Sequence, residues 1–169
     1  KTNFASHAEV TESVTQLNNY IDGAFSDNIL TVAEIKQIKE AKKNFESLFS
    51  EVKESYSYLV ISAAATDSDK TALTEAYNNL THETNGSYTL LIAAIDALIA
   101  LDKEEGDDVL DIGVVKGLLA EYESAYELFS KDLTAYYTAS ARLTEGIQNY
   151  LSSASDYIND VMSDDVLSP

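Results

Sequence analysis

Residues 31–52 read TVAEIKQIKEAKKNFESLFSEV, and this stretch decides the fold class. Thr31 and Glu34 have the spacing of a capping box, in which each side chain accepts a hydrogen bond from the other residue's backbone N–H. Because neither Pro nor Gly occurs between Thr31 and Ala65, the pattern predicts one helix about 50 Å long. Its apolar positions recur at steps of three, four and seven, on one face: Ile35, Ile38, Phe45, Phe49, Val52, Tyr56, Leu59 and Ala63.

A second helical pattern follows the turn signals at residues 66–69. Its apolar positions are Leu73, Tyr77, Leu80, Leu91, Ile95 and Leu98. Asn85-Gly86-Ser87 interrupts this pattern, and a Gly inside a helix costs about 1 kcal/mol relative to Ala. Since Asn-Gly also favours turns, we predict a kink or break near Gly86, with Ser87 able to cap the restarted helix.

A third pattern runs from Ile112 to Val161 and predicts a helix about 75 Å long, which is longer than a compact bundle needs. Residues 5–25 also have helical spacing. We therefore predict an all-α fold. The expected architecture is an elongated antiparallel helical bundle of three long helices, the middle one kinked or broken near Gly86, with a long continuous C-terminal connector helix.

The two ends of the chain carry the same motif. Residues 20–31 (YIDGAFSDNILT) align without a gap with residues 157–168 (YINDVMSDDVLS), at a constant offset of 137 residues. We interpret this echo as a tandem array, because a fixed period is typical of repeat proteins. Residues 1–25 would end a preceding repeat as its connector helix, residues 26–162 would form one helical-bundle repeat, and residues 163–169 would begin the next. A chance likeness between two helix ends is the alternative.

The composition excludes several classes of function. Acidic residues outnumber basic ones by 29 to 11, which gives a net charge of -18. Nucleic-acid binding needs clustered Lys and Arg, so we expect no nucleic-acid partner. The chain has no Cys, and its most apolar run, residues 88–101, is shorter than the roughly 20 residues that span a bilayer. We therefore expect neither a disulfide scaffold nor membrane insertion.

The residue types that could bind a metal or catalyse a reaction do not occur at the spacings that these sites require. The acidic loop at residues 102–108 fails the EF-hand spacing, because Gly106 at the sixth position would put Leu101 at the first ligand position. His7 and His82 are far apart in sequence, and no G-x-S-x-G motif occurs. We predict a protein that is not an enzyme, with no catalytic, cofactor-binding or metal-binding residue and no cofactor.

The chain has 11 Tyr residues, and two explanations stay open for them. Tyr122 and Tyr126 share one helix face, as do Tyr150 and Tyr157. Such rings could stack on sugars or on protein partners. Alternatively, they belong to the core, with their hydroxyl groups at its rim.

Three motifs resemble a helical module of tail proteins from phages and prophages of Gram-positive bacteria. They are SDNILTVAEIK at residues 26–36, AYNNL at residues 76–80 and YYTASARL at residues 136–143. Their order and spacing agree with the module over roughly residues 26–147. The resemblance implies a structural spacer in a tail-tip, baseplate or tail-fibre (antireceptor) protein, located in the virion tail, that positions host-binding domains.

The expected partners follow from this resemblance. They are other virion tail proteins or neighbouring repeats of the same chain, and a homo-oligomer such as a trimer stays open. The alternative function is a helical binding module of a prophage-encoded adhesin on the bacterial surface or outside the cell, in contact with a host protein or glycan. It would need an exposed apolar or aromatic patch.

Overall fold

The computed structural model describes residues 3–104 and 106–163, and it confirms the all-α fold class. The helices are α1 (His7–Ala24), α2 (Val32–Val60), α3 (Asp67–Thr81), α4 (Ser87–Ile99) and α5 (Ile112–Ser163). The only strands described are the two-residue β1 (Ile29–Leu30) and β2 (Asp108–Val109). The expected start of a further repeat, residues 163–169, lies outside the described residues apart from Ser163.

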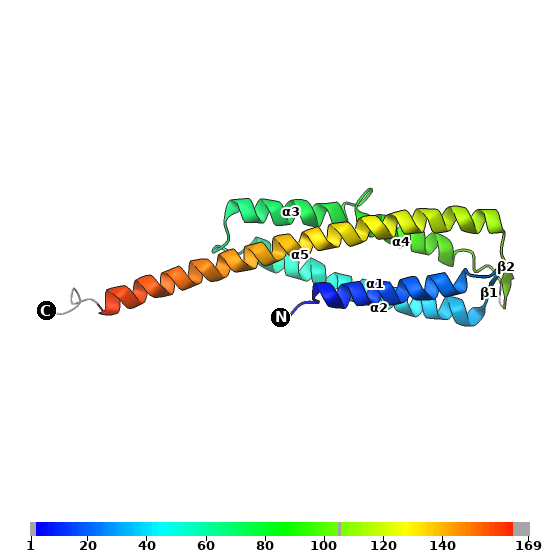
Figure 1. Cartoon of the computed structure of the whole chain (residues 1–169), viewed down its shortest axis with the longest axis horizontal. Helices are drawn as coiled ribbons and strands as arrows, with labels where there is room; N and C mark the ends of the chain where they lie inside the picture. Colours follow the sequence, from blue (N-terminus) through cyan, green and yellow to red (C-terminus); the bar gives the residue numbers. More distant parts are fainter. Residues whose placement is uncertain (1–2, 105, 164–169) are drawn as a thin grey trace.

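The chain makes four antiparallel passes rather than the three expected of the unit, because α1 also belongs to the bundle. α1 runs towards the strands, α2 returns, α3 and α4 together run forwards again, and α5 returns (Figure 1). β1 and β2 pair antiparallel, with Ile29 opposite Val109, and close the end of the bundle that we call the tip. The first and last helices are therefore antiparallel to each other.

Side-chain caps fix where the helices begin. The capping box predicted at Thr31 is present, since Thr31 accepts from the Glu34 N–H and Glu34 accepts from the Thr31 N–H. Ser6 and Glu9 form a second capping box at α1. Asp111 accepts from two N–H groups at the start of α5, those of Gly113 and Val114. A carboxylate there also interacts favourably with the helix dipole.

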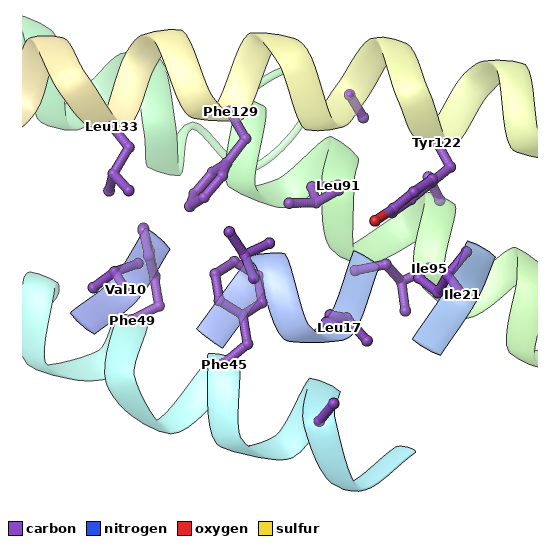
Figure 2. Close-up of a cluster of buried hydrophobic side chains, with 14 of the residues drawn as sticks. Val10, Leu17, Ile21, Phe45, Phe49, Leu91, Ile95, Tyr122, Phe129 and Leu133 are labelled. Atoms are coloured by element: carbon purple, nitrogen blue, oxygen red, sulfur yellow. The ribbon is translucent and has the colours of Figure 1, made fainter. Parts of the chain in front are cut away.

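The core is a layer of apolar side chains to which all five described helices contribute, and Figure 2 shows the part that lies between α1, α2, α4 and α5. Four rings form its centre. Phe49 stacks on Tyr88 with ring centroids 3.7 Å apart, and Phe129 meets Phe45 edge-on at 5.3 Å. From α1, the fully buried Val10, Leu17 and Ile21 face this layer, so α1 packs against the rest of the bundle.

Three local predictions meet different outcomes. The break near Gly86 is confirmed, because α3 ends at Thr81 and α4 begins at Ser87. The expected capping role of Ser87 is wrong, because Gly86 occupies the N-cap and the Ser87 hydroxyl is buried with no hydrogen-bond partner among the described residues. The first long helix ends at Val60 rather than continuing to residue 65, because a turn held by Ser62 precedes the Thr66 cap, and this leaves Ala63 exposed.

Substitution of Gly86 tests why the chain breaks at this point. A Cβ atom at Gly86 would lie 2.5 Å from both the His82 nitrogen and the Leu80 oxygen, which are backbone atoms. We expect Gly86→Ala to lower the free energy of unfolding by about 2 kcal/mol, since tight backbone contacts cannot relax cheaply. At Gly117 nothing lies within 4 Å, so Gly117→Ala should raise stability by about 0.5–1 kcal/mol. Urea denaturation followed by circular dichroism measures both, and a Gly86→Ala protein of unchanged stability would contradict the prediction.

Candidate interaction site

Three tyrosines of α5 connect this helix to its neighbours by hydroxyl hydrogen bonds. Tyr122 donates to Asn18 of α1 at 2.8 Å, and Tyr137 donates to the Ala5 carbonyl at 2.7 Å. Tyr136 and Ser55 of α2 share a hydrogen bond of 2.6 Å. These rings are therefore core residues whose hydroxyl groups reach polar atoms, while Tyr150 and Tyr157 of the same helix are exposed.

Burial changes how these tyrosines titrate. It raises the pKa of Tyr122 and Tyr137 well above the usual value, and nearby tyrosines and carboxylates raise both further. Burial also raises the pKa of Tyr136 to about 12, although its hydrogen bond with Ser55 acts in the opposite direction. The neutral phenols are therefore favoured in the folded protein.

Alkaline pH should destabilise the fold through these groups. Because the folded-state pKa of Tyr136 is raised from about 10 to about 12, its contribution is complete below pH 10 and is lost between pH 10 and pH 12. We expect the free energy of unfolding to fall by up to about 1.4 kcal/mol per pH unit for each such tyrosine. In urea titrations between pH 10 and pH 12, Tyr136→Phe should reduce the loss of the free energy of unfolding per pH unit by the contribution of one tyrosine. An unchanged slope would show that Tyr136 does not contribute.

Lys42 and the two histidines make contacts with nearby side chains and backbone. Lys42 pairs with Asp96 at 2.9 Å and with Glu46 at 3.6 Å. Burial would lower the pKa of Lys42, but these two partners outweigh it, and the pKa is raised. His7 stacks on Tyr137, and His82 instead accepts a backbone hydrogen bond from Thr84. Within residues 3–104 and 106–163, no three His, Cys, Asp or Glu side chains are grouped as metal ligands would be.

A groove with a volume of about 580 Å³ lies between α4 and α5. It is lined mainly by small side chains, including Ala93 and Ala97 of α4 and Ala120 of α5. Leu90 and Leu128 border it, with 38% and 40% of their surfaces exposed. Sequence reasoning did not find this groove, although the clustering of alanines on both helices was the available signal. Its shape fits an apolar side chain or helix better than a polar ligand.

The second exposed apolar surface is the end of α5. Residues 148–163 project beyond the bundle by about 24 Å (Figure 1). Leu151, Ile158 and Met162 expose 56%, 58% and 68% of their surfaces. We call the apolar stripe to which they belong the distal seam: Ile147, Leu151, Ala154, Ile158, Val161 and Met162. The sequence predicted the length of this helix but not that the bundle would leave its last turns uncovered.

Comparisons with known proteins give the chain no relatives: no protein family, no curated protein and no solved structure matches it. Among the helices described, none combines the length and the apolar content needed to cross a membrane. The fold, the groove and the distal seam are thus the observations from which a function must be argued.

Proposed function

We propose that the chain is a non-enzymatic structural spacer in a phage tail-tip, baseplate or tail-fibre protein, where it positions host-binding domains. The observation that carries the proposal is α5, a 52-residue helix that continues past its own bundle with an apolar stripe still facing one side. A helix of this kind can connect one folded unit to the next. The motifs at residues 26–36, 76–80 and 136–143 support the placement in a tail protein, because they resemble modules found there.

The proposal treats residues 26–162 as one repeat, with residues 1–25 as the end of the unit before it. The echo between residues 20–31 and 157–168 supports this division. Neighbouring repeats and other tail proteins are then the partners. The net charge of -18 suits a spacer, because copies that carry the same charge repel one another and stay solvated.

One observation favours a second candidate, a binding module of a bacterial surface adhesin. The groove between α4 and α5 could receive an apolar side chain or helix of a host protein, since Leu90 and Leu128 are exposed at its edges. Many helical proteins bind the apolar face of a partner helix in a groove of this kind.

Antibodies against residues 3–163 separate the two candidates. We expect electron microscopy of purified phage particles to show label at the tail, because the spacer is part of the virion. Label confined to the bacterial surface and absent from particles would contradict the proposal and favour the adhesin.

Removal of one repeat tests the spacer role within the tail. Deletion of residues 26–162 joins Phe25 to Ser163 in the register of the echo, so flanking domains should fold while host adsorption falls, because their spacing changes. The matched control replaces the groove edges by Leu90→Gln and Leu128→Gln, which should leave adsorption unchanged. The deletion also removes the groove, so adsorption that is lost in the control as well as in the deletion would indicate a binding module instead.

A further inference from the structure

The distal seam repeats a pattern that is already buried elsewhere in the chain. The offset of 137 residues that aligns the two end motifs can be extended towards the N-terminus along α1 and α5. Every member of the distal seam then falls on a buried apolar residue of α1 or of its C-cap. The buried partners, in order, are Val10, Val14, Leu17, Ile21, Ala24 and Phe25.

The polar positions between these residues agree as well. Ser152 aligns with Thr15 and Asn159 aligns with Asp22, and all four are exposed. The projecting part of α5 therefore has the apolar face of α1 and most of its polar face, and the exception is Tyr150, which aligns with the buried Ser13. The difference is that α1 is covered by α2, whereas in the distal seam Ile147 packs against the core of its own bundle and Leu151, Ile158 and Met162 are exposed.

Charge favours a partner like α2 over a second copy of the distal seam. Residues 143–163 contain Glu145, Asp156 and Asp160 but no Lys or Arg, so two such segments would repel each other. α1 is likewise acidic, with Glu9 and Glu12 near its start and no Lys or Arg. Residues 36–43 of α2 carry four lysines and one acidic residue, Glu40. Lys39 and Lys42 pair with carboxylates of the same bundle, and the exposed Lys36 and Lys43 can attract an acidic helix.

We infer that residues 147–162 are the first helix of a second copy of this unit, in which they occupy the position that α1 occupies here. The inference rests on the tandem arrangement of the proposed function and names the surface through which units join. In the second copy, Ser155 takes the place of Asn18 and lies beside the hydroxyl group of that copy's Tyr122. The connector helix then contributes to two cores, with its first part in one and its last turns in the next.

A two-unit chain tests this inference, in which residues 1–162 are followed directly by a second copy of residues 26–169. The protein has no Cys, so Leu151→Cys in the first copy alone introduces one thiol on the distal seam. In the single chain this thiol should react rapidly, because Leu151 is 56% exposed. In the two-unit chain its reaction rate should fall at least about tenfold, because the equivalent Val14 is 2% exposed and reaction requires local opening.

Matched variants separate burial of the seam from a general effect of chain length. Ser152→Cys in the first copy should react equally fast in both chains, because Thr15 at the equivalent position is exposed. Adding Ile158→Asp should restore rapid reaction at position 151, whereas Asn159→Asp should not. A thiol at position 151 that stays reactive while the second copy is folded, by circular dichroism, overturns the inference.

Self-association is the competing explanation, and sedimentation equilibrium tests it. Protection of position 151 in the single chain that grows with concentration, together with a dimer or trimer abolished by Ile158→Asp, would overturn the inference. The thiol experiment and the antibody experiment fail independently. A reactive thiol at position 151 would overturn the helix pairing but would not affect the location in the virion. Antibody label absent from phage particles would contradict the location but would not affect the helix pairing.

Discussion

The contact between aromatic rings at the centre of the bundle is the interaction on which the remaining structure depends. Phe45 and Phe49 of α2 meet Tyr88 of α4 and Phe129 of α5, so one cluster joins three helices that are far apart in the sequence. Full burial of one such side chain contributes about 1.5–3 kcal/mol, and paired rings add to this. α1 then closes the layer from outside, and the tyrosines of α5 fix how far the helices can slide along one another.

The sequence predicted the local features of this fold well. The cap at Thr31, the break before Ser87 and the uninterrupted length of α5 all depend on residues close together in the chain, which is why spacing and turn chemistry were sufficient. Features that depend on distant contacts were not predicted. The inclusion of α1 in the bundle and the groove along α4 arise from how helices pack, and a periodic pattern does not specify which helix covers which. The early end of α2 at Val60 is a local feature that the apolar spacing missed, because the turn at Ser62 interrupts the helix without a Gly or Pro.

The exposed apolar surface of α5 was likewise predicted only in part. The sequence identified the apolar stripe of α5 and the echo between the chain ends, but only the structure shows where the bundle stops covering that stripe. Between Val115 and Leu143 most of the stripe is buried, whereas Leu151, Ile158 and Met162 are exposed, although the residue types do not change. Exposure of this kind follows from the length of the neighbouring helices. α2 and α3 meet at a turn at residues 61–66, and α5 continues beyond it.

The even number of passes has a consequence for any chain that contains more than one such bundle. α1 begins part-way along the bundle and runs towards the tip, and α5 leaves the bundle at the end opposite the tip (Figure 1). The polypeptide therefore enters and leaves each bundle on the side away from the tip. The bundles would project to the side of the path of the chain and would not follow one another end to end along it. Each tip, with Val109 85% exposed, would point away from that path, and the advance along it per unit would be set mainly by the projecting turns of α5.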